Sequence, residues 1–578
     1  MKYWQFILAS LIFPTPLLAQ QALPLPEKAL HSHYVDSVYR KMSRRKRIAQ
    51  LFIVPAYSNK SAAFQDSIGA LIQKFQPGGI IFFQGGPIRQ ASLQNHYQDL
   101  LKIKALIAMD GEWGLGMRLD STVSFPYQMG LGAIGNNGLI RQMAVQIAYD
   151  FRRMGMQLNF APDIDINNNP DNSVINYRSF GEIRDNVADK GLAYITGLQS
   201  GHVLSTVKHF PGHGDTNVDS HLALPVLPFT RQRLDSLELY PFRKLIAGGA
   251  GAVMIAHMHV PAIDSSEGIP TTLSKAAVEG LLRTDYHFSG LIVTDAMNML
   301  GLAKYYTPAE AAVKALQAGN DLVEMSPDLP AALKAVRKAA RRGEISRAEL
   351  NLRCRKVLAY KEWSGLNSYH PVNTAHLPGD LNSVAAISLV QQLSDSTLTL
   401  LQADQPVLTG LREAINQPSA NKVILSKMKR TALLDLGVTG PTLISDSLKG
   451  AVTVFSLPKN GSQQAVDSLK SQLGNYGHLL VAIHDQRPRP GAKVSFSPAM
   501  INLVSTLAGA KTTALIFLTN AYVLGQFAGL EKAPVLLLTY QDSRFAEISV
   551  LKFLREGLTC SGHLPVSILP VFKAGQGL

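Results

Sequence analysis

The sequence predicts an α/β protein of two domains, and three features carry this prediction. Short apolar segments alternate with amphipathic segments from about residue 45 to 360, and the same alternation resumes after residue 384. Between them, residues 366–383 are rich in Pro, Gly, Ser and Asn, a composition typical of a linker. We therefore expect a first α/β domain over residues 35–365, and a second α/β domain over residues 384–578.

The composition fits a globular protein with a sizeable core. Hydrophobic residues make up 46% of the 578 residues and charged residues 17%, which excludes a disordered chain. Two cysteines exclude a disulfide scaffold and a Cys-based zinc array. Cys354 falls at an apolar helix position, so core packing is the favoured interpretation, and pairing with Cys560 is the alternative.

The chain is basic, with 56 Lys and Arg residues against 42 Asp and Glu residues and a net charge of +14. Such a charge suits a nucleic acid, a membrane surface or an anionic polymer such as a cell wall. No dense basic run with interleaved aromatic residues occurs beyond Arg44–Arg47, so we expect no nucleic-acid partner.

The first twenty residues predict a secretory signal peptide. Lys2 precedes a mostly apolar run from Trp4 to Ala19, which is short for a bilayer span and is interrupted by two prolines. A membrane anchor is the alternative. No later segment has 18 uninterrupted apolar residues, so we expect no stable membrane span. The predicted signal peptide implies an exported protein, periplasmic or extracellular.

Apolar segments predict the strands of each domain in order. The first domain has candidates at Gly79–Phe83, Ala105–Met109, Leu158–Ala161, Val203–Val207, Ala252–Ala256, Leu291–Thr294 and Leu322–Met325. The second has candidates at Leu398–Leu401, Val452–Leu457, Leu479–Ile483, Ala514–Leu518 and Val535–Thr539. Capping boxes at Thr307/Glu310 and Ser346/Glu349 predict the starts of two helices. Repeated strand–helix units favour a (β/α) barrel or an open doubly wound sheet for the first domain.

Polar residues stand where the predicted strands of the first domain end. Asp110 follows LIAM, Lys208 and His209 follow STV, His257 follows AVMIA, and Asp295 follows LIVT. In a barrel the carboxyl ends of all strands open on one face, where active sites lie. These residues are therefore expected to share a pocket, with His257 more simply explained as a structural histidine.

The densest polar segment, Lys208–His221, holds one Lys, three His and two Asp in fourteen residues. Asp219 and His221 are two residues apart, so a bent loop sets a carboxylate against an imidazole, orienting the ring for proton transfer. Asp295 is the candidate nucleophile that would act together with Asp219 and His221, and a structural cap is an equal alternative for Asp295.

A metal site is the competing interpretation of the same segment. His209, His213, Asp219 and His221 are ligand-type residues, and zinc serves many barrel hydrolases. Pro211 and two glycines interrupt the helix that would align an i, i+4 pair, so we expect no metal.

Six motifs in order along residues 45–360 resemble glycoside hydrolase family 3, and specifically its β-N-acetylglucosaminidase branch. They are AMDGEWGLGMRL, NFAPDIDINNNP, NYRSFGE, KHFPGHG, DTNV with DSH, and VTDAMNM. The resemblance implies a (β/α)8 TIM barrel, and the second domain resembles the α/β sandwich of longer members. It also implies a retaining mechanism that needs no cofactor.

Carried over onto this sequence, the resemblance makes Asp295 the nucleophile and His221 the general acid and then the base. Asp219 would orient and charge-tune His221. The implied sugar-binding residues are Asp110, Arg118, Arg178, Lys208 and His209. Charged hydrogen-bonding groups of this kind suit sugar hydroxyls.

The expected function is an exported retaining exo-β-N-acetylglucosaminidase that acts on terminal β-linked GlcNAc of peptidoglycan fragments or related glycans. Alternatives are a β-glucosidase, a variant that transfers the sugar to phosphate, a carbohydrate-binding protein and a metal hydrolase. Two departures from the family pattern bear on the aglycone. Asn176-Tyr177 replaces the Gly-Asp that many members have before Arg-Ser-Phe, and Asp110-Gly-Glu-Trp113 replaces the commoner acid–x–Glu–Gly–Gly at the rim of the sugar pocket.

Overall fold

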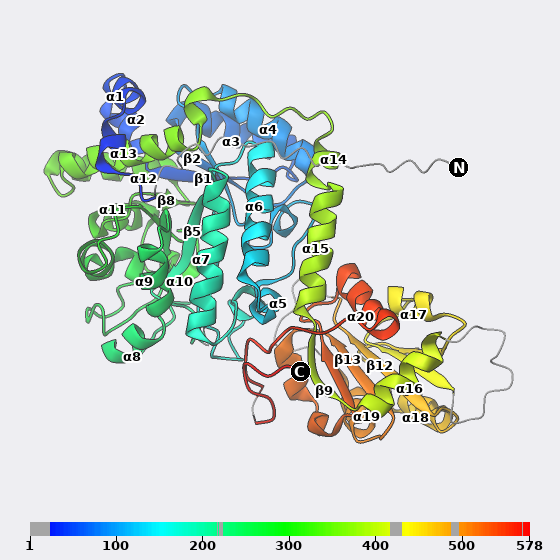
Figure 1. The fold of residues 1–578 in the computed structure, drawn as a ribbon. Helices are drawn as coiled ribbons and strands as arrows, with labels where there is room; N and C mark the ends of the chain where they lie inside the picture. Colours follow the sequence, from blue (N-terminus) through cyan, green and yellow to red (C-terminus); the bar gives the residue numbers. More distant parts are fainter. Residues whose placement is uncertain (1–22, 217, 219–222, 417–429, 487–495, 569) are drawn as a thin grey trace, which may run out of the picture.

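Two bodies joined by a long helix make up the described part of the chain (Figure 1). The computed structural model describes residues 23–216, 218, 223–416, 430–486, 496–568 and 570–578. The joining helix, α15 (Val384–Thr397), runs from the side of the first body to the second. The expected signal peptide, residues 1–20, lies outside the described residues. Among the described helices, none has the length and apolarity needed to cross a bilayer.

The first body is a barrel of eight parallel strands in the order β7-β6-β5-β4-β3-β2-β1-β8. A parallel bridge between Val293 and Leu322 joins the two end strands and closes it. The strands are β1 (Phe52–Ala56), β2 (Gly79–Phe82), β3 (Leu106–Met109), β4 (Leu158–Asn159), β5 (Leu204–Phe210), β6 (Ala252–Ile255), β7 (Leu291–Thr294) and β8 (Val323–Glu324). The barrel alternative of the first-domain prediction is therefore confirmed.

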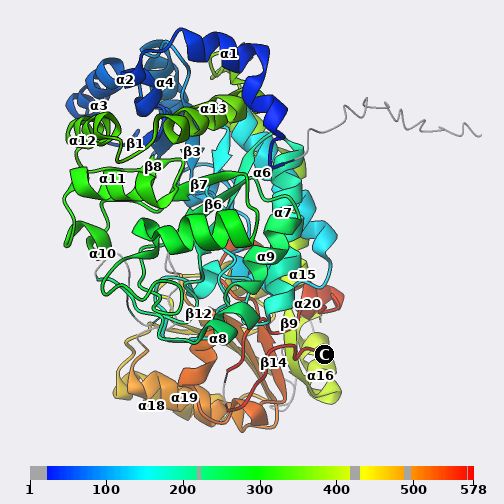
Figure 2. The same ribbon diagram turned by 90° about the vertical axis from the view of Figure 1, so that its left-hand side faces the viewer.

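Helices cover the outside of this barrel (Figure 2), and along the chain a helix follows each strand. They are α3 (Ala62–Phe75), α4 (Pro87–Asp99), α6 (Asn137–Arg153), α7 (Arg184–Ser200), α9 (Tyr240–Ala247), η5 (Ala276–Asp285), α11 (Pro308–Ala318) and α12 (Leu329–Arg342). Further helices are α1 (His33–Arg40), α2 (Arg44–Ala49), α5 (Gln128–Ala133), α8 (Arg231–Ser236), α10 (Leu300–Ala303), α13 (Arg347–Trp363) and α14 (Leu377–Leu381). Both predicted capping boxes are present, at the starts of α11 and α13. Cys354 is buried in α13 and unpaired, as core packing predicts.

Apart from shifts of one or two residues at strand ends, the predicted strands differ from the observed ones in three places. β1 was not predicted because Pro55 interrupts its apolar run, and β10 was not predicted because Asp435 interrupts another. β5 continues through Phe210, so Lys208 and His209 lie within the strand and not after it. The pairing of β5 with β6 shifts register between Val207 and Phe210.

The second body is a six-stranded sheet in the order β11-β10-β12-β13-β14-β9, with only β9 antiparallel to its neighbour. Its strands are β9 (Thr399–Ala403), β10 (Thr431–Leu436), β11 (Thr453–Leu457), β12 (His478–His484), β13 (Thr513–Leu518) and β14 (Val535–Leu538). Its helices are α16 (Gln405–Asn416), α17 (Leu443–Leu448), α18 (Gln463–Leu473), α19 (Pro498–Ala508) and α20 (Arg544–Glu556). Along β12, Leu480 and Ala482 share a core with α16 and α20, whereas Val481 and Ile483 share one with α18 and α19. Alternate residues thus face opposite helix layers, which confirms the predicted α/β sandwich.

The second body contacts the barrel at the loops that follow β3 and β4. The backbone N–H of Tyr127 donates to the side chain of Gln541 at 2.8 Å. The hydroxyl of Tyr522 donates to the carbonyl of Asn167 at 3.0 Å. Both barrel loops lie at the carboxyl ends of the strands, so the second body reaches the face where barrel active sites lie.

Candidate active site

A cavity of about 470 Å³ opens at the carboxyl ends of the barrel strands. Six of the eight predicted site residues line it. They are Asp110, Arg118, Arg178, Lys208, His209 and Asp295. Residues from the ends of four barrel strands, β3, β4, β5 and β7, or from the loops that follow them, therefore converge on one pocket.

Five charged side chains form a continuous chain of ion pairs along one wall of this cavity. Asp110 binds Arg118 (Oδ2 to Nη2, 2.6 Å) and Lys208 (Oδ1 to Nζ, 3.0 Å). Lys208 also donates to Glu112 (Nζ to Oε1, 2.9 Å), and Glu112 in turn accepts from Arg178 at 2.7 Å. Each buried charge is paired, as burial of charged groups requires.

The cations keep the carboxylates of this wall ionised. Burial raises the pKa of Asp110, but Lys208 and Arg118 outweigh burial and hold that pKa well below its usual range. Burial likewise opposes ionisation of Glu112, yet Arg178 and Lys208 lower its pKa to about 2. At neutral pH the wall therefore presents fixed acceptors and donors, which suits hydrogen bonding to sugar hydroxyls.

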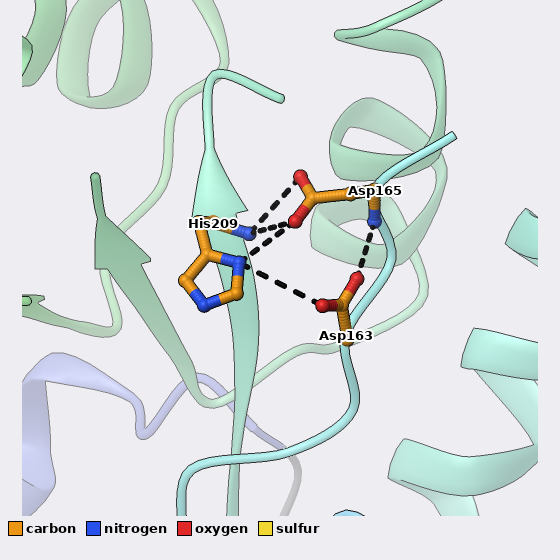
Figure 3. Close-up of side chains that lie close together, drawn as sticks. All are labelled: Asp163, Asp165 and His209. Carbon is orange, nitrogen blue, oxygen red and sulfur yellow. Dashed lines mark hydrogen bonds and ion pairs between the residues drawn. The ribbon is translucent and has the colours of Figure 1, made fainter. Parts of the chain in front are cut away.

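His209 is oriented by a buried carboxylate (Figure 3). Its Nδ1 lies 2.7 Å from Oδ2 of Asp165, and its Nε2 lies 3.3 Å from Nη2 of Arg178. Burial opposes ionisation of Asp165, but His209 and His213 lower its pKa. An ionised Asp165 can only accept, so Nδ1 of His209 carries the proton and Nε2 is the acceptor on the Arg178 side.

Asp163, Asp165 and His209 are the one group among the described residues whose ligand-type atoms could surround a cation, all within 4.8 Å of one another. The Nδ1–H of His209 is already committed to Asp165, and Nη2 of Arg178 lies 3.7 Å from Oδ2 of Asp163. Burial, followed by the charge of Asp165, raises the pKa of Asp163 well above its usual range. A cation would compete with the guanidinium and with a proton, so the donor set fits a hydrogen-bonded cluster and not a metal centre.

Asp295 directly follows β7 and is partly exposed on the cavity. Its backbone N–H donates to the carbonyl of Ile255 at 2.9 Å, and its Oδ1 accepts from the N–H of Ala296 at 2.8 Å. His257 is fully buried, with Nε2 3.1 Å from the carbonyl of Ala296 and Nδ1 2.7 Å from Oγ1 of Thr272. The structural interpretation of His257 is thus confirmed: it holds the segment that carries Asp295.

Asp219 and His221, the predicted acid/base pair, lie outside the described residues. In the same segment His213 is buried, its pKa is lowered to about 4 by burial, and its Nδ1 lies 2.8 Å from Oγ1 of Thr216. His213 is therefore neutral at neutral pH and held by its own loop.

The two departures from the family pattern meet at one rim of the cavity. Trp113 packs edge-on against Tyr127, with ring centroids 4.8 Å apart, and lies 5.9 Å from the ring of Tyr177. Trp113 and Tyr177 line the cavity. Next to Tyr177, the side chain of Asn176 accepts a hydrogen bond from Asn520 of the second body. This rim is aromatic and is supported from the second domain.

Four acidic residues of the site were not predicted. Glu112, Asp163 and Asp165 lie within motifs that were recognised as a whole, but their partners are far away in sequence, such as Arg178 for Glu112. Glu324 ends β8 in an otherwise apolar run, LVEM. The predicted strand Leu322–Met325 places Glu324 inside the strand, so the rule that located Asp110 and Asp295, a polar residue directly after a strand, did not locate it.

A closed barrel with a charged pocket and an aspartate at the carboxyl ends of its strands defines a (β/α)8-barrel enzyme. The sequence profile of the glycosyl hydrolase family 3 N terminal domain matches residues 43–360, more than half of the chain. The chain therefore belongs to glycoside hydrolase family 3.

Two of the named relatives are beta-hexosaminidases. Beta-hexosaminidase A of Pseudoalteromonas piscicida is 35% identical over 281 residues, which are 45% of this chain and 47% of that relative. The match thus spans about half the length of that relative. Beta-hexosaminidase LpqI of Mycobacterium tuberculosis is 29% identical over 341 residues, 56% of this chain and 83% of the relative.

The match to a solved structure extends over both bodies. A glycoside hydrolase family 3 beta-N-acetylglucosaminidase from Paenibacillus sp. str. FPU-7 aligns with a TM-score of 0.72 at 29% identity. The alignment covers 91% of this chain and 99% of that chain. The arrangement of a barrel followed by a second α/β domain is therefore shared with that enzyme.

Proposed function

We propose that this protein is a retaining exo-β-N-acetylglucosaminidase that releases terminal β-linked GlcNAc. One observation carries the proposal: Asp295 lines the same cavity as the charged wall that runs from Arg118 to Arg178. A carboxylate beside an array of hydroxyl-binding groups is the equipment of a glycosidase that forms a covalent intermediate. The relatives named beta-hexosaminidase support the choice of sugar.

The proposed reaction has two displacements. In the first, a carboxylate oxygen of Asp295 attacks the anomeric carbon, the glycosidic bond breaks, and His221 protonates the departing oxygen. In the second, His221 takes a proton from water, the water oxygen attacks the same carbon, and Asp295 is released. Two inversions give net retention. Asp219 orients the ring of His221 and stabilises its charged form.

The natural substrate and location are also part of the proposal. We infer that the enzyme is exported, periplasmic or extracellular, and acts on peptidoglycan fragments or related glycans. The apolar run over residues 4–19 supports export, and the net charge of +14 suits an anionic wall.

The test compares release of nitrophenol from 4-nitrophenyl β-N-acetylglucosaminide and from the corresponding glucoside. The parent protein should prefer the N-acetylglucosaminide, and Asp295→Asn should lower kcat/KM by about a thousandfold or more. Asp189→Asn is the matched control, because Asp189 is exposed on α7. Preference for the glucoside, or full activity of Asp295→Asn, would contradict the proposal.

Two additions to the same assay separate the remaining alternatives. With inorganic phosphate present, a hydrolase releases free sugar, whereas a phosphorylase releases the sugar 1-phosphate. After treatment with a chelator the activity should persist, because no step above uses a metal. Loss of activity on chelation, restored by a divalent ion, would instead support a metal hydrolase.

A further inference from the structure

Glu324 is an acidic residue of the cavity for which the proposed reaction has no use. It is the last residue of β8, its side chain lines the cavity, and the residue is 3% exposed. Its backbone is fixed on both sides: its N–H donates to Oγ1 of Thr294 at 3.0 Å, and its carbonyl accepts from the N–H of Met297 at 3.0 Å. The backbone that bears this carboxyl group is therefore fixed next to β7, the strand that Asp295 directly follows.

The carboxyl group of Glu324 has an unmet hydrogen bond. Its Oε2 is buried and has no hydrogen-bond partner among the described residues. A buried polar atom without a partner is costly, and most such atoms in folded proteins are satisfied by protein, water or a ligand. Because Glu324 lines the cavity, a molecule seated in that cavity is the candidate partner of Oε2.

The surroundings of Glu324 favour its neutral form. Burial is the main cause, and the carboxylates of Asp110 and Asp295 add to it; together they raise the pKa of Glu324 well above its usual range. The cations Lys208 and Arg118 act in the opposite direction but do not cancel the effect. The environment of Glu324 thus favours its protonated form, and a protonated carboxyl can donate a hydrogen bond.

We propose that Glu324 is a substrate-binding residue whose protonated carboxyl group donates a hydrogen bond to a hydroxyl oxygen of the sugar seated against Asp295. This inference rests on the proposed function in one respect, that the cavity holds a sugar. The carboxylates of Asp110 and Glu112 can only accept, so Glu324 adds a donor that carries no charge to the pocket. The proton stays on Glu324 throughout, and no bond of the substrate is broken by this residue.

The test uses two substitutions that differ in hydrogen bonding but little in size. Glu324→Gln keeps a neutral donor and should hold kcat/KM within about threefold of the parent. Glu324→Met removes the donor and leaves a sugar hydroxyl unpaired, so kcat/KM should fall by about 10- to 100-fold, mainly through KM. Glu267→Gln, on an exposed loop, is the matched control.

A pH profile separates this role from a purely structural one. With the 4-nitrophenyl substrate, whose leaving group needs little protonation by His221, kcat/KM of the parent should fall at alkaline pH as Glu324 ionises beside Asp110 and Asp295. In Glu324→Gln, that alkaline limb should move to higher pH, because the amide does not ionise. Thermal unfolding shows whether each variant is folded. If Glu324→Met does not fold, Glu324→Asp replaces it, and its shorter side chain should likewise lower kcat/KM.

Three results would overturn the inference. Glu324→Gln losing as much activity as Glu324→Met would show that the ionised form is needed. Parental activity in both variants would show that Glu324 does not bind the sugar. An unchanged alkaline limb in Glu324→Gln would show that the proton of Glu324 is irrelevant.

Failure of the proposed function gives a different pattern. If the parent hydrolyses only the glucoside, the same variants are compared on the glucoside. If it hydrolyses neither substrate, binding of GlcNAc and glucose is measured by calorimetry. Weaker binding by Glu324→Met than by Glu324→Gln then supports the inference, and equal or absent binding contradicts it.

Discussion

At the scale of single residues, the site depends on Glu112, which no sequence motif singled out by itself. Glu112 is fully buried and binds Arg178 through three contacts of 2.7 to 3.2 Å, while Lys208 reaches it at 2.9 Å. A planar guanidinium matched to a carboxylate in this way is fixed in direction as well as position. Glu112 therefore orients the two cations that we expect to bind the sugar.

Replacing Arg178 by Lys tests this geometry. Lysine keeps the charge but cannot form the paired contacts with Glu112, so Arg178→Lys should lower kcat/KM about tenfold or more, mainly through KM. Arg231→Lys is the control, since Arg231 lies in an exposed ion pair on α8. Parental kinetics in Arg178→Lys would show that the orientation of the guanidinium is unimportant.

At the scale of elements, the short helix η3 (Asn176–Arg178) links the second domain to the site. Arg178 of η3 lines the cavity. The side chain of Asn176 in η3 accepts a hydrogen bond from the side chain of Asn520, which caps the short helix after β13. Asn176 is buried, and its φ of 38° is a backbone conformation that Asn adopts more readily than most residues. The second domain thereby fixes the turn that presents Arg178.

Asn520→Ala should loosen this turn without touching the cavity. We expect KM to rise about three- to tenfold, because a buried hydrogen bond is lost and its partner is left unpaired. Asn475→Ala, at an exposed turn of the same domain, should leave KM unchanged. Steady-state kinetics decide this, and equal KM values for both variants would mean that the second domain does not position Arg178.

At the scale of the whole molecule, apolar runs were enough to predict most strands and both domains. The two strands that escaped prediction contain residues that are unusual in strands, Pro55 in β1 and Asp435 in β10. The site was predictable where a polar residue ends a strand, as at Asp110. The pairing of Glu112 with Arg178 was not, because the two are 66 residues apart and meet only once the barrel closes.

The stability of the molecule should depend on pH through a buried histidine of the second domain. His484 has Nδ1 3.1 Å from Asp542 and Nε2 3.4 Å from Asp435. Burial opposes its charged form, but these two carboxylates raise the pKa of His484 to about 9. A raised pKa stabilises the fold fully below the unfolded value of about 6.5, and this stabilisation is lost as pH rises through about 9.

The prediction concerns the unfolding transition of the second domain in urea. Between pH 6 and pH 10, the parent should lose up to about 3 kcal/mol from this group, whereas His484→Asn should lack that loss. His563→Asn is the control, because His563 belongs to the same domain and is exposed. Equal pH dependence in parent and His484→Asn would contradict the role of this cluster.

The central claim is that Asp295 forms a covalent bond to the sugar, and trapping that species tests it most directly. The purified protein is incubated with an activated fluorinated N-acetylglucosaminide, which slows release of the sugar from the enzyme, and its intact mass is measured. The account predicts a mass increase of one sugar residue, located by peptide mapping on Asp295 and absent from Asp295→Asn. A label on another residue would contradict the account. Hydrolysis of an unfluorinated β-N-acetylglucosaminide with inversion at the anomeric carbon would contradict it as well.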